Sequence, residues 1–136
     1  MLRAYLSHPI RGKKGKDATP GDIAANNQAA IQFADTVRWR FPALDLYVPA
    51  EHDEALTIFL HKGYITIDQL LEADCEVLAK RDFLLVYTPT SLISSGMFRE
   101  MQFAVIHNIP FCILPAASRP WMRLLGHFIE VNFLKG

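Results

Sequence analysis

The sequence predicts an α/β fold, built as a doubly wound parallel sheet of four to five strands. Strand-like and helix-like patterns alternate along the chain, which is typical of parallel sheets with right-handed crossovers. Residues 83–87 form a continuous apolar run, as expected of a central strand covered on both faces. A length of 136 residues suits one core, so residues 1–136 are expected to form a single domain.

The expected elements follow from the spacing of apolar residues. Short apolar runs predict strands at residues 2–7, 44–48, 83–87 and 110–114. Helical spacing predicts helices at residues 22–41, with Asp22 as N-cap, and at 51–61, 66–80, 96–108 and 121–131. The basic, glycine-containing stretch 11–16 is expected to be a loop. Ligands of doubly wound sheets bind beyond the carboxyl ends of the strands, so the loops after Ser7 and Tyr87 are the expected place for a site.

Composition and charge exclude several classes of protein. Fourteen basic and fourteen acidic side chains cancel, so no net field favours a nucleic acid polymer or a membrane surface. No apolar run approaches the roughly 18 residues of a membrane span, and a signal peptide is not evident, so a cytoplasmic protein is expected. The histidines and cysteines lack the spacing of a metal site or a disulfide framework. The first strand is not followed by a Gly-x-Gly-x-x-Gly turn. Neither a metal nor a cofactor is expected.

Asp74 interrupts an apolar stripe in the helix expected over residues 66–80. Its neighbours at helical spacing are Leu70, Leu71, Val77 and Leu78. A carboxyl group buried among such residues is usually paired, hydrogen-bonded or held protonated with a raised pKa, and the last of these suits a general acid. The alternative is a helix turned so that Asp74 lies in water at the edge of the stripe.

Glu100 presents the same anomaly in the helix that follows the strongest strand. Apolar residues, Met97, Phe103 and Ala104, lie three or four positions away. The start of a helix favours an anion, so Glu100 is either an ordinary first-turn carboxylate or an ionised group facing a substrate. Residues leading into this helix suit sugar or phosphate oxygens, although serines there are more often plain caps. They are Ser94, Ser95 and Gly96.

Two carboxyl groups in one cleft, one ionised and one protonated, are the usual apparatus for cleaving a bond to an anomeric carbon. We expect Glu100, ionised, to attack C1′ or to stabilise the oxocarbenium ion. We expect Asp74, protonated, to assist departure of a nucleobase.

Four features of the sequence occur together: the segment Tyr-Leu-Ser-His-Pro-Ile-Arg-Gly at residues 5–12, Asp74, Asp82 eight residues later, and Ser-Ser-Gly-Met-Phe-Arg-Glu at residues 94–100. This combination resembles the nucleoside 2-deoxyribosyltransferase superfamily, which includes the deoxynucleoside 5′-monophosphate N-glycosidases. The resemblance extends to about Leu114. Its most specific part is a Ser-x-Gly-x-x-x-Glu pattern that opens a helix after a strand.

The resemblance implies a role for each of these residues. Glu100 would be the nucleophile, Asp74 the acid, and Tyr5 the residue that orients Glu100, although from sequence alone a strand tyrosine could equally be packing in the core. The loop after the first strand would hold sugar and phosphate, with Arg11 clamping the phosphate. That loop comprises Ser7, His8, Pro9, Ile10, Arg11 and Gly12.

The expected activity is cleavage of the N-glycosidic bond of a (deoxy)ribonucleoside or its 5′-monophosphate, with transfer of the sugar to water or to another nucleobase. The choice of acceptor and of phosphorylation state stays open. The alternative is a non-catalytic nucleotide-binding or sensor module of the same fold, against which the combination of Tyr5, Asp74 and Glu100 argues. The resemblance also implies a homodimer or a higher homo-oligomer.

Overall fold

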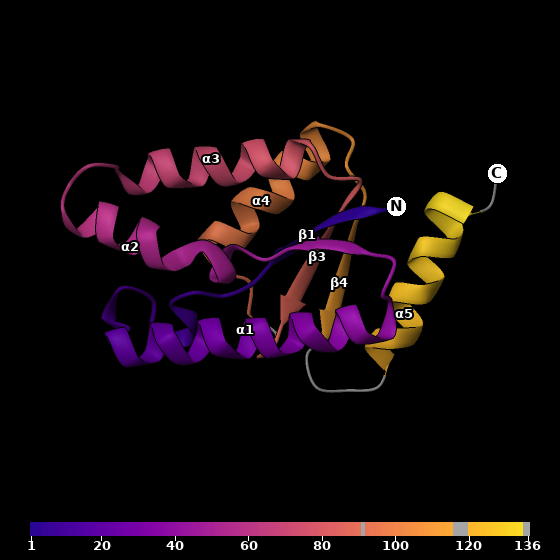
Figure 1. The fold of residues 1–136 in the computed structure, drawn as a ribbon, viewed down its shortest axis with the longest axis horizontal. Helices are drawn as coiled ribbons and strands as arrows, with labels where there is room; N and C mark the ends of the chain where they lie inside the picture. Colours follow the sequence, from indigo (N-terminus) through magenta and orange to yellow (C-terminus); the bar gives the residue numbers. More distant parts are fainter. Residues whose placement is uncertain (91, 116–119, 135–136) are drawn as a thin grey trace.

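The computed structural model describes residues 1–90, 92–115 and 120–134. The described residues form a four-stranded sheet with helices on both faces (Figure 1). The strands are β1 (Arg3–Ser7), β2 (Asp45–Tyr47), β3 (Phe83–Thr88) and β4 (Phe111–Pro115). Their order is β2-β1-β3-β4, and every pairing is parallel. The predicted doubly wound α/β fold is confirmed.

Helices cover the sheet in two layers. The α-helices are α1 (Pro20–Arg40), α2 (Asp53–His61), α3 (Ile67–Ala79), α4 (Ser95–Ile106) and α5 (Pro120–Ile129). Shorter turns are 3-10 helical at η1 (Gly12–Asp17) and η2 (Pro49–His52), and π-helical at η3 (Glu130–Leu134). Figure 1 shows α3 and α4 together on one side of the sheet and α1 on the other. The site discussed below lies under α3 and α4.

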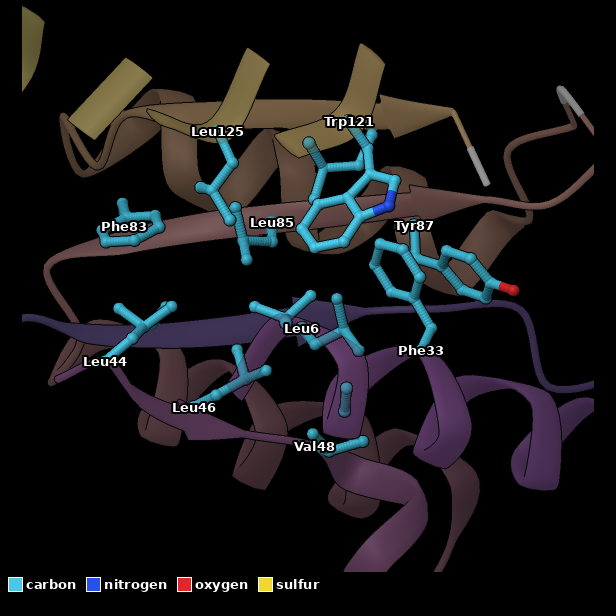
Figure 2. Packing of buried hydrophobic residues seen from close by; sticks show 14 residues of the cluster. Leu6, Phe33, Leu44, Leu46, Val48, Phe83, Leu85, Tyr87, Trp121 and Leu125 are labelled. Carbon is cyan, nitrogen blue, oxygen red and sulfur yellow. The ribbon is translucent and has the colours of Figure 1, made fainter. Parts of the chain in front are cut away.

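Alternation along the strands divides the core between these layers. Leu6 and Leu85 face α1 and α5, where Figure 2 shows Phe33 beside Tyr87 with Trp121 above them. The Phe33 ring stacks on Tyr87 at a centroid distance of 4.3 Å and meets Trp121 edge-on at 5.3 Å.

The opposite face of the sheet packs against α3 and α4. Its buried cluster comprises Tyr5, Leu78, Leu84, Val86, Met97 and Ala104. Tyr5 is the member of this cluster that carries a hydroxyl group.

β1 lies between β2 and β3, and Tyr5 pairs with Tyr47 on one side and with Leu84 on the other. The chain leaves β1 through α1 to reach β2, and later returns to the other side of β1 as β3. This reversal of strand order is a topological switch point, where doubly wound sheets place their ligands. The carboxyl ends of β1 and β3 are thus the candidate location.

All five predicted helix starts differ from the observed ones by one or two residues. α1 begins at Pro20 rather than Asp22, because Thr19 is the N-cap: its hydroxyl accepts a hydrogen bond from the Asp22 N–H at 3.1 Å. The Asp22 carboxylate accepts one from the Thr19 N–H at 2.8 Å, which completes a capping box. Similarly, α4 begins at Ser95 behind the N-cap Ser94. The predicted loop over residues 11–16 contains the turn η1.

Replacing Thr19 with alanine should lower the free energy of unfolding by about 1 kcal/mol, because the capping bond is lost. Urea denaturation measures this, with Thr57→Ala on the exposed face of α2 as a control that should change stability by only about 0.5 kcal/mol or less. A neutral Thr19→Ala would mean that the helix starts at Asp22 after all.

Candidate functional site

Glu100 lies on the inner face of α4 with its side chain buried at the switch point. Glu100 as a whole residue is 8% exposed to solvent. The Ser7 hydroxyl, at the carboxyl end of β1, donates a hydrogen bond of 2.8 Å to Glu100 Oε1. The first turn of α4 contains no acidic residue, so Glu100 is not an ordinary first-turn carboxylate.

Tyr5 lies two residues before Ser7 and faces the same side of the sheet. Its residue is fully buried, and its hydroxyl has no hydrogen-bond partner of good geometry. The hydroxyl is close enough to the Glu100 carboxyl for each group to shift the pKa of the other. A buried, unpartnered hydroxyl is costly, so Tyr5 is a donor available to Glu100 or to a ligand beside it.

Burial raises the pKa of Glu100 to about 7. The nearby Tyr5 and Ser7 hydroxyls lower this pKa, and the charge of Asp74 raises it. The carboxyl group therefore changes its protonation state close to neutral pH. Groups poised in this way are common where proton transfer or nucleophilic attack occurs.

Asp74, in the middle of α3, is partly buried. Burial, and then the charge of Asp53, raises its pKa to about 6. Asp74 in turn raises the pKa values of Tyr5 and Tyr47. The structure thus brings the two predicted carboxyl groups together with Tyr5.

Burial raises the pKa of both carboxyl groups, whereas the sequence-based expectation was a raised pKa for Asp74 and an ionised Glu100. The physical reason is burial, because Glu100 lies deeper than Asp74 and pays a larger cost for its charge. A positive charge developing on a ligand beside Glu100 would favour its ionised form.

The loop after β1 is held to the rest of the domain by His8. This ring is buried, which lowers its pKa and keeps it neutral. Its Nε2 accepts a hydrogen bond from the Ala50 N–H at 3.2 Å, while Nδ1 lies 3.3 Å from the Pro9 carbonyl oxygen. Accepting at Nε2 leaves the proton on Nδ1. His8, predicted to bind substrate, therefore anchors the loop to the turn before α2.

Gly12 and Asn26 shape the next part of this loop. Asn26 Nδ2, on α1, donates a hydrogen bond of 2.9 Å to the Ile10 carbonyl oxygen. Gly12 has a φ of 66°, and a Cβ there would lie 2.9 Å from Asn26 Nδ2. A side chain at position 12 would press on the Asn26 amide, and the positive φ is one that residues with a Cβ rarely adopt, so both features favour glycine. Arg11 lies between Ile10 and Gly12 in the sequence. It is exposed, and its guanidinium makes no ion pair with any described residue.

The three residues predicted at the start of α4 have separate roles. The Ser94 hydroxyl caps the helix by accepting a hydrogen bond from the Met97 N–H at 3.3 Å. Ser95 is exposed. The space around Gly96 is open, with no atom within 4 Å of an added Cβ. Neither Ser95 nor Gly96 is therefore needed for packing of the helix start.

Sequence reasoning missed Tyr47 and Asp53, which interact electrostatically with Asp74, and Asn27, which binds Asp53. Tyr47, at the end of β2, stacks against Tyr5 at 5.5 Å. Asp53, the first residue of α2, accepts a hydrogen bond of 2.9 Å from Asn27 Nδ2. Asn27 had a signal, because it interrupts the apolar stripe of α1 between Ile23 and Ala30. Asp53 had none, since it looks like any carboxylate in a first turn.

Asp82, part of the sequence pattern, lies at the other end of the sheet. Its carboxylate accepts a hydrogen bond of 2.8 Å from the Arg3 N–H, and its own N–H donates to the Arg3 carbonyl oxygen at 2.6 Å. Asp82 therefore joins the amino ends of β1 and β3 and has no place in the site.

The described residues, 1–90, 92–115 and 120–134, lack both a candidate metal site and a candidate membrane-spanning helix. They contain no group of three or more His, Cys, Asp or Glu side chains placed to hold a metal ion. Within the same ranges, no helix combines the length and the apolar character needed to span a bilayer.

Comparison with known proteins gives a relationship in fold. No family model and no curated protein matches the chain. The crystal structure of a conserved protein from Enterococcus faecalis V583 is similar, with a TM-score of 0.62 and 19% identity over 99% of this chain and 77% of that one. Identity at this level shows a common fold alone, and the description of that protein states no activity.

The buried Glu100 should make stability depend on pH. Its folded-state pKa of about 7 lies above the ordinary 4.5, so the folded protein holds this proton more tightly than the unfolded chain. The resulting stabilisation is full below pH 4.5 and is lost as pH rises through 7, by up to about 3 kcal/mol. Chemical denaturation across this range should show a smaller loss for Glu100→Gln than for the wild type. If wild type and Glu100→Gln lost the same stability as pH rises, the Glu100 carboxyl group would be solvated in the folded protein.

Proposed function

We propose that the protein cleaves the N-glycosidic bond of a nucleoside or nucleoside 5′-monophosphate, passing the sugar to water or to a second nucleobase. The proposal includes membership of the nucleoside 2-deoxyribosyltransferase superfamily, a cytoplasmic location and a homo-oligomeric state. One observation carries the proposal. The buried Glu100 carboxyl group at the switch point accepts a hydrogen bond from Ser7, and both the unpartnered Tyr5 hydroxyl and the Asp74 carboxyl group are close enough to shift its pKa.

This group of side chains suits glycosidic chemistry better than other reactions that use a single acid. Two carboxyl groups with separately raised pKa values can divide the roles of nucleophile and acid. The hydroxyls of Ser7 and Tyr5 are donors that fix the Glu100 carboxylate once it is ionised. No other nucleophile is needed for the reaction.

The proposed reaction has two displacements at C1′. Glu100 forms a bond to C1′ as the C1′–N bond breaks, and the electron pair of that bond leaves with the nucleobase. The proton of Asp74 passes to the departing base, which leaves as a neutral molecule. Water or a second base then displaces Glu100 from C1′ and gives up a proton to the Asp74 carboxylate, which regenerates both the Glu100 carboxylate and the Asp74 acid. The acceptor alone distinguishes hydrolysis from transfer.

Binding of a 5′-phosphate is proposed for the loop after β1. Arg11 is the exposed cation there, and the backbone on either side of it is fixed by the contacts of Asn26 with Ile10 and Gly12. A guanidinium on a fixed loop can bind phosphate with two parallel hydrogen bonds.

The direct test is to incubate the protein with nucleosides and 5′-monophosphates, with and without a second free base, and to follow released base by chromatography. Wild type should release base, and Glu100→Gln should lose at least about a thousandfold in kcat because the nucleophile is gone. Glu76→Gln, an exposed glutamate on α3, is the matched control and should retain full activity.

The outcomes separate the candidate activities. Release from substrate alone identifies a glycosidase, whereas new nucleosides formed only with added base identify a transferase. Ligand binding by both wild type and Glu100→Gln, with no turnover by either, would instead identify a nucleotide-binding module.

Arg11→Ala should raise KM for monophosphates about tenfold or more while leaving KM for the corresponding nucleosides within about twofold, because the charge-assisted bonds to phosphate are lost. Steady-state kinetics on matched pairs of substrates measures this. Lys16→Ala, which removes a cation from the same basic stretch, is the control. An equal rise in KM for monophosphates and for nucleosides would contradict the proposal that Arg11 binds the phosphate.

A further inference from the structure

A groove of about 530 Å³ lies between α3 and α4, on the outside of the layer that these two helices form (Figure 1). Its lining includes Cys75 of α3 together with Phe103 and Ile106 of α4. The outer surface of the two helices is therefore hollowed and partly apolar.

The outward side of α4 is apolar although it faces solvent. Phe98 is 54% exposed, Val105 62% and Ile106 75%. Both later residues follow Phe98 after about two turns of helix, so the three share one side of α4. The helix carries two charged side chains, Arg99 and the buried Glu100. Exposed apolar patches on a folded domain often mark protein contacts.

Opposite charges border this groove. Glu72, on the α3 side, is exposed and forms no ion pair with any described residue. Arg99, on the α4 side, has one ion pair within the described chain, at 3.7 Å to Asp68, and both side chains are largely exposed. An exposed ion pair of this kind contributes little to stability. Glu72 and Arg99 are thus available to a partner.

A second copy of the chain would complement this surface. In a two-fold dimer the same patch of each subunit meets the other, so a residue i that contacts j is matched by j contacting i. The apolar side of α4 would then lie in the partner's groove, and Arg99 would face Glu72 of the partner subunit at two equivalent places. The two α3–α4 pairs would form a four-helix bundle, a common way to bury such helices.

We propose that this α3–α4 surface binds a second copy of the chain through a two-fold contact. The surface comprises Glu72, Phe98, Arg99, Val105 and Ile106. The inference rests on the homo-oligomeric state included in the proposed function, to which it assigns a surface, and it is independent of the proposed reaction. Because α4 also carries Glu100, the contact would lie on the outer side of a helix whose inner side forms the candidate site.

The first test removes the apolar contact. Ile106→Glu changes a largely exposed residue, so the fold of each subunit should be retained, as circular dichroism can check. The dissociation constant of the dimer, measured by analytical ultracentrifugation, should rise about tenfold or more because a charge would be buried in the contact. Trp39→Glu, an exposed apolar residue of α1 on the other face of the sheet, is the control and should leave the constant unchanged.

The second test exchanges the charges. Arg99→Glu and Glu72→Lys each place like charges across the contact, so each variant alone should dimerise about tenfold more weakly or worse. In an equimolar mixture of the two, both contacts of the mixed dimer again join opposite charges. The mixture should therefore dimerise about as tightly as the wild type. Mixing cannot restore an ion pair that lies within one subunit.

The outcomes separate this inference from the proposed reaction. A wild type that stays monomeric at its highest soluble concentration would overturn the inference and the homo-oligomeric state together. A wild-type oligomer that tolerates Ile106→Glu and both charge reversals would overturn the α3–α4 surface alone. Loss of the dimer in the variants and its recovery on mixing, in a protein that releases no base, would support the surface and contradict the proposed reaction.

Discussion

The parallel pairing of β1 with both β2 and β3 is the constraint on which the rest of the structure depends. Because β1 is central, its side chains are buried on both faces, and Tyr5 and Ser7 are forced toward α3 and α4. Of these helices, α3 crosses from β2 to β3, on either side of β1, and α4 leads from β3 to β4. Strand order therefore brings a hydroxyl of β1 against a carboxyl group of α4, at a sequence separation that no local pattern reveals.

The cost of this arrangement is a carboxyl group in an apolar layer. Met97 and Ala104, one turn from Glu100, are buried in the same cluster as Leu84 and Val86. Glu100 is tolerated there through the Ser7 hydrogen bond and through its proton. Structural side chains rarely combine deep burial, a single hydrogen bond and a pKa near neutrality, whereas functional ones often do. A molecule optimised for stability alone would carry an uncharged residue at this position.

The fold was predictable because hydrophobic patterns report burial directly. The run at residues 83–87 proved to be the fully buried strand β3, and alternation of elements implied parallel pairing. Helix starts were less predictable, since Thr19 and Asp22 are both good caps and only tertiary geometry chooses between them. For the site, polar residues inside apolar stripes identified Asp74 and Glu100. Their relative proton affinities depend on depth of burial and on Asp53, which are properties of the packed molecule.

The close contact between Gly12 and Asn26 has a consequence for how the sequence can vary. Any side chain at position 12 would displace the Asn26 amide and release the Ile10 carbonyl oxygen. A homologue or an engineered variant that replaces Gly12 would have to shift the Asn26 side chain and also hold a φ of 66°, which residues with a Cβ rarely adopt. A smaller residue at position 26 would relieve the contact but not the backbone strain, so position 12 is expected to stay glycine even in relatives that differ at position 26.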